Sequence, residues 1–371
     1  MKFPFVRPEI PPLSEWQGFL QIPYERRYFT NFGELETQFS EELRERFGGA
    51  GAAVTLAANA TCALTAALIA HEVQGRVAIP NFTFPATLHA VLSARCTPVL
   101  CDVDEKTGEM SAASLRRACE RYEISAVMPV RPYGIVRPLG PIIEIARSVG
   151  AKIIVDGAAA LGAGRVEVAE DVTEVVSLHA TKSLGIGEGG AIFSHESRKA
   201  AMREAINFGL RPDRGFAFGI NGKMSEFQAA VGLAQLRHAD RLVQGRRAMA
   251  AWYDEALADS GMVLPDPNAV TPWSTYPVWL PLHVDAEQFQ QACHARGLQV
   301  RRYYWPTPQR GFTEKLDGAD GLEVSTALAE RALCLPIYAS ATADERREIA
   351  EIILDCLEAT GTRVPAAQAI G

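Results

Sequence analysis

Residues 152–163 read KIIVDGAAALGA. Its apolar run predicts a buried strand, which Asp156 ends in a single carboxylate followed only by small residues. A buried acid at the carboxyl end of a strand is costly unless it meets a partner. We expect Asp156 either to cap a helix or to bind a cation, such as the protonated nitrogen of a cofactor ring.

A second stretch, SLHATKSLGIGEGG over residues 177–190, places Lys182 just past another apolar strand. Small and apolar residues follow the lysine, and the glycines among them allow the backbone to turn tightly. A lysine held away from water keeps the neutral amine that attacks an aldehyde, whereas a solvated surface lysine is the alternative. A strand-end acid and such a lysine, one strand apart, are the combination used by enzymes that depend on pyridoxal 5′-phosphate (PLP).

Around these two stretches, strand and helix patterns alternate from residue 34 to about residue 210. The expected strands are 53–56, 77–79, 97–101, 126–130, 153–155, 172–178 and 190–194. Apolar strands that alternate with helices predict an α/β fold, in which a mostly parallel central sheet carries helices on both faces. Such sheets bind ligands at the carboxyl ends of their strands.

The pattern changes in the last third of the chain. A long helix is expected from about residue 225 to 257, and strands at 276–282 and 298–304. Further helices are expected at 286–296, 324–332 and 343–357, and a loose tail at 360–371. We therefore predict a large cofactor-binding domain over residues 1–240 and a smaller α+β domain over residues 241–371.

Composition excludes several classes of function. The chain has 371 residues, of which 48% are hydrophobic, and its 37 basic and 44 acidic residues give a net charge of −7. This acidic balance argues against a nucleic-acid-binding face, and charged residues interrupt every apolar run that approaches the length of a membrane helix. Residues 1–16 contain no apolar core of a signal peptide. We expect a cytoplasmic protein with no nucleic-acid or membrane partner.

Cysteines, histidines and glycines complete the exclusions. The seven cysteines form no C-x-x-C pair and are expected to be free thiols, and the seven histidines show no zinc-binding spacing, so no metal site is expected. Residues 48–51 lack the G-x-G-x-x-G spacing of dinucleotide-binding proteins, which argues against an oxidoreductase of that type.

Over nearly its whole length, the chain resembles the DegT/DnrJ/StrS family of PLP-dependent nucleotide-sugar aminotransferases. The matching blocks, in the order of the family, are residues 29–33, 59–64, 80–87, 155–163, 177–182, 187–190 and 219–230. The resemblance implies the type I fold of PLP-dependent aminotransferases. Residues 220–226 and 300–306 resemble the branch that aminates dTDP-linked keto-6-deoxysugars.

The resemblance implies a role for each matching position. Lys182 would form the internal aldimine with PLP and later move protons, and Asp156 would bind the pyridinium nitrogen. Phe84 would stack on the ring, and Ala159 would lie at its face. The implied phosphate contacts are Ala60, Thr61 and Ser177 of one subunit and Asn221 from its neighbour, which makes the active site shared within a homodimer.

Three positions depart from the family. Ala60 stands where glycine is usual, Ala159 where glutamine or histidine is usual, and Arg131 where many relatives carry histidine. An arginine there is suited to a carboxylate or phosphate of the substrate. The implied substrate contacts are Asn31, Arg131, Tyr133, Arg211, Arg214 and Tyr304.

The implied reaction moves the amino group of L-glutamate to a keto group of a nucleotide-linked keto-6-deoxysugar, and the branch that the chain resembles implies dTDP as the nucleotide. A PLP-dependent sugar dehydratase of the same family is an alternative, although that branch generally replaces the lysine with histidine and Lys182 counts against it. A catalytically silent sensor or scaffold with this fold is the other alternative, which only Ala60 and Ala159 favour.

Overall fold

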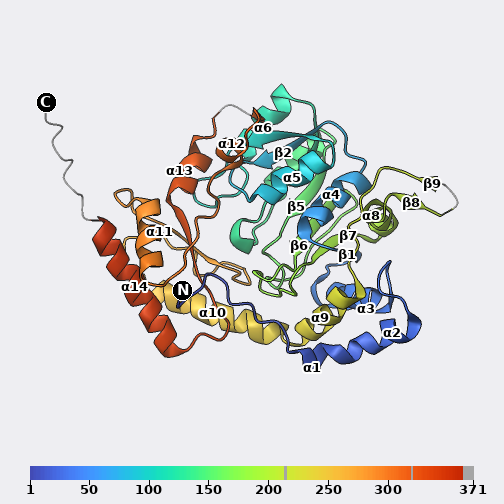
Figure 1. Ribbon diagram of the computed structural model, residues 1–371. Coiled ribbons are helices and arrows are strands. Elements are labelled where there is room, and N and C mark those ends of the chain that lie inside the picture. The colour runs from blue at the N-terminus through green and yellow to red at the C-terminus, as the bar shows by residue number, and fades with distance from the viewer. Residues whose placement is uncertain (213–214, 319–320, 362–371) are drawn as a thin grey trace.

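The computed structural model describes residues 1–212, 215–318 and 321–361 and is built around one central sheet (Figure 1). Its eight strands lie in the order β1-β7-β6-β5-β4-β2-β3-β11. Strand β7 runs antiparallel to both of its neighbours, and the other pairs are parallel. Their bounds are β1 Ala52–Ala57, β2 Arg76–Pro80, β3 Thr97–Cys101, β4 Ile124–Val127, β5 Lys152–Asp156, β6 Val172–Ser177, β7 Gly190–His195 and β11 Asp317–Gly318.

Helices cover both faces of this sheet, as the fully apolar strands require. On one face, α4, α5 and α8 pack against alternate strand residues such as Ile154 and Val175. On the other face, α6 and α7 cover one half of the sheet and α3 and α9 cover the other half. These helices are α3 Glu34–Phe47, α4 Ala60–Ala70, α5 Pro85–Ser93, α6 Ala112–Arg121, α7 Gly140–Ser148, α8 Lys199–Ile206 and α9 Glu226–Arg237. The predicted α/β class is confirmed.

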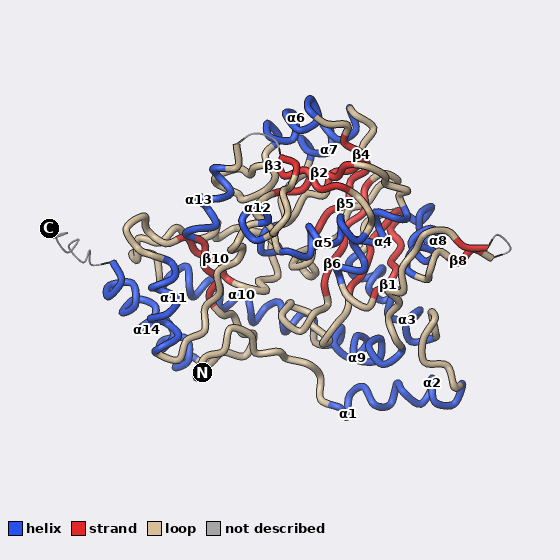
Figure 2. The backbone as a smooth tube through the Cα atoms, turned by 45° about the horizontal axis from the view of Figure 1, so that its top comes forward, coloured by secondary structure: helices blue, strands red, loops and turns tan. Residues whose placement is uncertain are grey.

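A smaller unit with its own core lies beside the sheet (Figures 1 and 2). The antiparallel pair β10 Tyr276–Trp279 and β12 Ala332–Leu335 forms its strand layer. Its helices are α10 Ala239–Ala256, α11 Ala286–Ala295, α12 Pro308–Gly311, α13 Glu323–Arg331 and α14 Ala343–Gly361. The packing crosses the predicted boundary at several places; for example, Phe3 belongs to this core and β11 joins the central sheet next to β3.

Two short features complete the described chain. Before the sheet, α1 Leu13–Trp16, a 3-10 turn and α2 Gln21–Arg26 run along the outside of the molecule beneath α9 (Figure 1). Strands β8 Leu210–Arg211 and β9 Gly215–Phe216 form a hairpin that projects from the body beside α8 in both views (Figures 1 and 2).

Two predicted elements differ from the structure. The helix expected over 225–257 is broken at His238, which ends α9 and precedes α10. The strand expected over 298–304 is wrong, since this segment makes only single bridges, one from Leu298 to Phe3 and one from Arg301 to Cys334. Its apolar side chains are buried in the smaller core without joining a ladder, so their burial imitates the pattern of a strand.

All seven cysteines are free thiols, as expected. Within the described ranges, none of the helices combines the length and apolar character needed to cross a membrane.

Candidate active site

The carboxyl ends of the parallel strands bring the predicted residues to one edge of the sheet. Asp156 is the last residue of β5, and Ser177 is the last residue of the neighbouring β6. Lys182 lies in the loop that leaves β6, where its backbone N–H donates to the carbonyl of His179 at 2.8 Å. Asp156 and Lys182, which are far apart in sequence, therefore lie near each other because the parallel strands β5 and β6 end at the same edge of the sheet.

Asp156 is held as a buried acceptor. Asp156 is only 4% exposed, and its Oδ2 accepts a hydrogen bond of 2.7 Å from the hydroxyl of Thr87. Oδ1 accepts from the N–H of Ala158 at 3.1 Å. Burial raises the pKa of the Asp156 carboxyl, while these two donors and the nearby Lys182 amine lower it. The carboxylate is thus oriented and ready for a cationic partner.

Lys182 lies within electrostatic reach of Asp156. Burial lowers the pKa of its ammonium group, and the Asp156 carboxylate opposes that shift. The Cys334 thiol of β12 is close enough to act on Lys182 as well, which places the amine where the smaller unit meets the sheet. A lysine with a lowered pKa holds a larger share of neutral, nucleophilic amine near neutral pH.

The first turn of α4 faces the same edge. Asn59 caps this helix by accepting from the N–H of Cys62 at 2.9 Å, so the N–H groups of Ala60 and Thr61 stand at the positions that a helix leaves for an anion. Gly190, the partner of Ser177 in the sheet, packs against this turn: a Cβ there would lie 2.7 Å from the Ala60 nitrogen. Ala60, Thr61 and Ser177 are therefore brought together.

Phe84 offers an open aromatic face. It precedes α5, is 50% exposed, and meets the ring of Tyr303 edge-on at 5.9 Å between centroids. Ala159 is buried three residues after Asp156, and its carbonyl packs so closely on Gly134 that a Cβ there would stand 2.1 Å away. An exposed ring, a buried acid, a lysine and an anion-binding turn together fit a PLP molecule.

Asn221 and Asn31 lie on exposed loops. The Nζ of Lys223 donates to Asn221 Oδ1 at 2.7 Å, and the adjacent carbonyl of Gly222 accepts from the N–H of Ala58, just before α4. Asn31 has a positive φ of 61°, and its carbonyl accepts from the hydroxyl of Tyr28 at 2.9 Å. Neither loop is placed against Asp156 or Lys182 by these contacts.

The structure corrects the expectation that Arg131 holds a substrate anion. Its Nε and one terminal nitrogen donate to the two carboxylate oxygens of Glu174 at 2.9 and 3.1 Å. The other terminal nitrogen donates to the carbonyl of Arg137 at 3.0 Å. Because all three nitrogens of the guanidinium already have acceptors in the protein, Arg131 is a structural cation here.

Tyr133 is likewise corrected. It is buried, and its hydroxyl donates to the carbonyl of Tyr303 at 2.7 Å, so it packs beneath the site instead of facing a substrate. Tyr304 stacks on the Tyr133 ring with 5.2 Å between centroids, and its hydroxyl accepts from the Tyr133 N–H at 3.2 Å. Tyr304 is also close enough to Asp156 for the carboxylate to contribute to a raised pKa of its phenol, although burial is the larger cause.

Arg211 is not part of this cluster. Arg211 lies in β8 and forms an ion pair with Glu204 of α8 at 3.0 Å. Arg214 lies outside the described residues.

Two residues that touch the site escaped sequence reasoning. Thr87 lies inside a block that resembles the family, but only the fold brings its hydroxyl to Asp156. Glu174 is the one charged residue of the apolar strand β6, and an acid in such a strand is itself a signal that a buried cation lies nearby.

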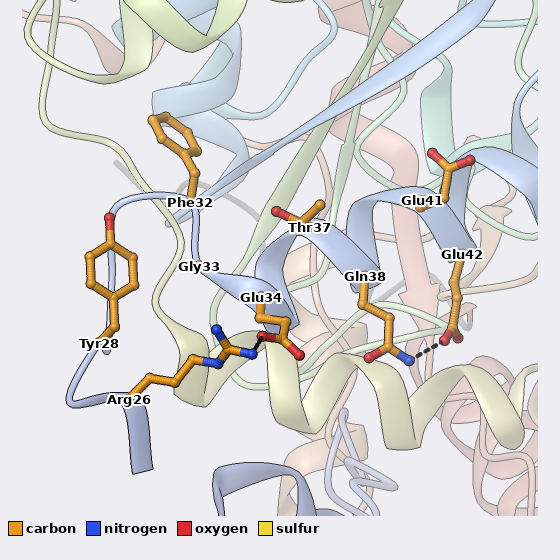
Figure 3. A pocket seen from close by; sticks show the side chains of 9 residues that line it. All are labelled: Arg26, Tyr28, Phe32, Gly33, Glu34, Thr37, Gln38, Glu41 and Glu42. Atoms are coloured by element: carbon orange, nitrogen blue, oxygen red, sulfur yellow. Dashed lines mark hydrogen bonds and ion pairs between the residues drawn. The ribbon is translucent and has the colours of Figure 1, made fainter. Parts of the chain in front are cut away.

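Two hollows of the surface lie away from Asp156 and Lys182. One of about 900 Å³ is lined by residues of α2, of α3 and of the loop between them, where Arg26 pairs with Glu34 at 2.9 Å and Gln38 donates to Glu42 (Figure 3). None of the predicted site residues lines it. A second hollow, of about 820 Å³, includes Arg211. No group of residues suited to hold a metal ion occurs within 1–212, 215–318 and 321–361.

The sequence matches one family of aminotransferases over most of its length. Residues 21–354 match the model of the DegT/DnrJ/EryC1/StrS aminotransferase family. The chain is 32% identical to the dTDP-4-amino-4,6-dideoxy-D-glucose transaminase of Shigella dysenteriae, over 91% of this chain and 94% of that protein. It is 31% identical to the GDP-perosamine synthase of Caulobacter vibrioides, over 79% and 83% of the two chains.

Solved structures agree with this assignment. A protein of Bacillus cereus ATCC 10987 assigned as a PLP-dependent aminotransferase superposes with a TM-score of 0.88 at 28% identity, covering 96% of this chain and all 100% of that one. DesI, solved with its TDP-sugar product, superposes with a TM-score of 0.85 at 27% identity, covering 96% and 94%. The chain therefore belongs to the DegT/DnrJ/EryC1/StrS aminotransferase family, and it is an aminotransferase with the cofactor pyridoxal 5′-phosphate.

Proposed function

We propose that this protein is a cytoplasmic homodimer that moves the amino group of L-glutamate to a keto group of a dTDP-linked keto-6-deoxysugar. The names of the relatives support a nucleotide-linked sugar as the acceptor, and the transaminases of Escherichia coli and Shigella dysenteriae act in the dTDP series by name. The meeting of Asp156 and Lys182 at one buried edge of the sheet is the observation that carries the proposal.

Each group at this edge has a task. PLP, when bound, supplies an electron sink for negative charge at the carbon that carries the amino group. Asp156 would hold the protonated ring nitrogen, and the exposed face of Phe84 would support the ring. Thr61 and Ser177, with the N–H groups of the first turn of α4, would bind the phosphate.

Lys182 is the residue that would attach the cofactor and move protons. Its lowered pKa gives it neutral amine, which would serve as a nucleophile toward the cofactor and as a base at its Nζ.

The active site of the homodimer is shared between its subunits. Asn221 is exposed on a loop beside the start of α4, and we assign it to the phosphate bound by the neighbouring subunit. The projecting hairpin carries Arg211, which we assign to the approach of the nucleotide sugar in that neighbouring site.

The alternatives are weaker on the same observations. A dehydratase of this family is disfavoured by the lysine at position 182 and by its proximity to Asp156. A silent scaffold has no need to hold Asp156 with two donors beside an amine of lowered pKa.

The test supplies purified protein and PLP with L-glutamate and a panel of dTDP-, GDP- and UDP-linked 4-keto and 3-keto sugars. Mass spectrometry measures the amino sugar, and a coupled assay measures 2-oxoglutarate. We expect equal amounts of both products, with a dTDP-linked 4-keto-6-deoxysugar as the preferred acceptor. Production of 2-oxoglutarate without transfer to any sugar on the panel would reject the sugar acceptor, and loss of water without amination would favour the dehydratase.

A further inference from the structure

A buried ion pair lies directly behind the acid of the active site. Arg131 follows β4, Glu174 lies in β6, and β5 with Asp156 at its end runs between them. The two side chains are 12% and 4% exposed, and the guanidinium binds both carboxylate oxygens at 2.9 and 3.1 Å. Two parallel hydrogen bonds fix the orientation of both groups.

Both members of the pair also contact the backbone that carries Asp156. The N–H of Arg131 donates to the carbonyl of Asp156 at 3.0 Å. Glu174 packs on the next residue so closely that a Cβ on Gly157 would lie 2.4 Å from its Oε1. The Asp156–Gly157 peptide is thus contacted by the Arg131 backbone and by the Glu174 side chain, while the Arg131 side chain acts on it through Glu174. Gly157 is required for the approach of Glu174.

The pair also balances charge beside Asp156. Burial is the largest cause of the raised pKa of the Glu174 carboxyl. The charge of Arg131 opposes this shift, and the nearby Asp156 carboxylate adds to it. Two neighbouring buried carboxylates would favour protonation of one of them unless a cation is present. The other groups that act on Asp156 are the Thr87 hydroxyl, the Ala158 N–H, the Lys182 amine and the Tyr304 phenol.

We propose that Arg131 and Glu174 are a positioning pair that holds the Asp156 carboxylate in place and in its charged form toward the ring nitrogen of PLP. This inference rests on the proposed use of Asp156. The pair supports the backbone that carries Asp156. Residue 159, three positions after Asp156, is an alanine and offers only a methyl group. Arg131 thereby acts through Asp156 and does not touch the substrate.

The experiment uses the full-length protein loaded with PLP and measures the pH midpoint of the visible absorption band of the bound cofactor. The form that absorbs at longer wavelength carries an additional proton, so a buried negative charge nearby raises this midpoint and a buried positive charge lowers it. Glu174→Gln leaves the Arg131 cation without its counter-ion, and we expect the midpoint to fall by about half a pH unit or more.

Arg131→Met leaves Glu174 without its cation, and we expect the midpoint to rise by a similar amount. The double variant, Arg131→Met with Glu174→Met, removes both charges, so its midpoint is expected close to that of the unchanged protein. It also removes the support of Asp156, so PLP should dissociate more readily from it. Arg131→Lys keeps the charge but loses the second hydrogen bond, so it should keep the midpoint while PLP dissociates more readily.

The matched control is the more exposed pair of Arg147 in α7 and Asp171, which is also bidentate, at 2.7 and 3.0 Å. Asp171 directly precedes β6, at the end of that strand opposite to Ser177. Arg147→Met and Asp171→Asn should leave the midpoint unchanged. Thermal unfolding of each protein without PLP shows which variants fold. Glu174→Gln and Arg131→Lys keep the shape of the pair and serve as the second route if the methionine variants do not fold.

Opposite shifts that cancel in the double variant, together with faster loss of PLP from that variant, support the positioning pair. Midpoints that stay fixed, or that move in the same direction in both single variants, overturn it and leave a pair that only stabilises the fold. A protein that shows no visible band with PLP in any form contradicts the proposed function itself, so the two failures are distinguishable.

Discussion

At the scale of residues, the Thr87 hydroxyl is the group that most lowers the pKa of Asp156 and so favours its charged form. Thr87 donates to Asp156 at 2.7 Å and lies 2.6 Å from the hydroxyl of Thr83, so the carboxylate ends a short chain of polar groups in a buried place. Because this hydrogen bond lowers the pKa of Asp156 against the effect of burial, its loss favours the protonated acid. A protonated acid binds the cationic ring nitrogen less strongly.

Thr87→Val keeps the shape of the side chain and removes the donor. A hydrogen bond to a charged acceptor contributes about 1.5–3 kcal/mol, so we expect PLP to bind roughly tenfold more weakly or worse. Equilibrium titration of the protein with PLP, followed by absorbance, measures the dissociation constant. Thr87→Ser, which keeps a hydroxyl, is the control, and equal affinity of the valine variant and the unchanged protein would rule out this role.

Single residues could be predicted from the sequence where their place on an element determines their environment. Asp156 and Lys182 follow apolar strands, and strand ends of a parallel sheet meet at one edge. Arg131 could not be predicted, because its partner Glu174 lies on a strand that is two positions away in the sheet. Whether an arginine at a strand end faces a ligand or a buried acid is determined only by tertiary packing.

At the scale of elements, α3 begins on a cap supplied from far along the chain. The Glu226 carboxylate, in the first turn of α9, accepts from the N–H groups of Leu35 and Glu36, both at 2.9 Å. Gly33 leaves the space for this contact, since a Cβ there would lie 2.5 Å from the Glu226 carboxyl carbon. The N–H of Glu226 also donates to Phe29, so α9 fixes the loop that precedes α3.

This junction buries a second acid, which makes its stability depend on pH. Burial raises the pKa of Glu36 from 4.5 to about 7, and nearby Glu226 adds to that shift while Arg203 opposes it. Between these two values the folded protein holds a proton that the unfolded chain releases, so stability falls as the pH rises through this window. Above this pH window, Glu36 is ionised in the folded and the unfolded states, and its buried charge lowers the free energy of unfolding by the full amount.

Glu36→Gln removes this titration. The stability of the variant relative to the unchanged protein should therefore increase from pH 5 to pH 8, by on the order of 2 kcal/mol. Urea unfolding of both proteins at the two pH values measures the difference. Glu42→Gln on the exposed side of the same helix is the control. A difference between the Glu36 variant and the unchanged protein that is the same at both pH values would contradict the buried titration.

Elements were predicted well where periodicity and burial coincide, as in β5 and β6. The segment 298–304 could not be predicted correctly, because Leu298 and Val300 are buried among side chains of the smaller core and not in a ladder. The break between α9 and α10 was missed because no glycine or proline marks it: His238 ends one helix and precedes the next.

At the scale of the whole molecule, the projecting hairpin exposes apolar side chains that a monomer has no reason to keep. Phe216 in β9 is 79% exposed, and Phe208, Leu210 and Phe218 are each exposed beside it. Apolar side chains gathered on one projecting element are typical of an interface. They support the proposal that a second copy of the chain completes the active site.

We therefore expect sedimentation equilibrium at micromolar concentration to give about twice the monomer mass of 40.3 kDa. Phe216→Glu should shift the equilibrium toward the monomer, because it places a charge in the apolar contact. Leu282→Glu, at a residue of the smaller unit that is 86% exposed, is the control and should stay dimeric. A mass near that of one chain over the whole concentration range would reject the shared site.

The attachment of the cofactor to Lys182 is the claim on which the whole account depends. Reduction of the PLP-loaded protein with borohydride, followed by proteolysis and mass spectrometry, locates the modified residue directly. We predict one pyridoxyl group on the peptide that contains Lys182, loss of the visible band on reduction, and neither result in Lys182→Ala. A protein that remains unmodified, or that carries the pyridoxyl group on another lysine, would contradict the account.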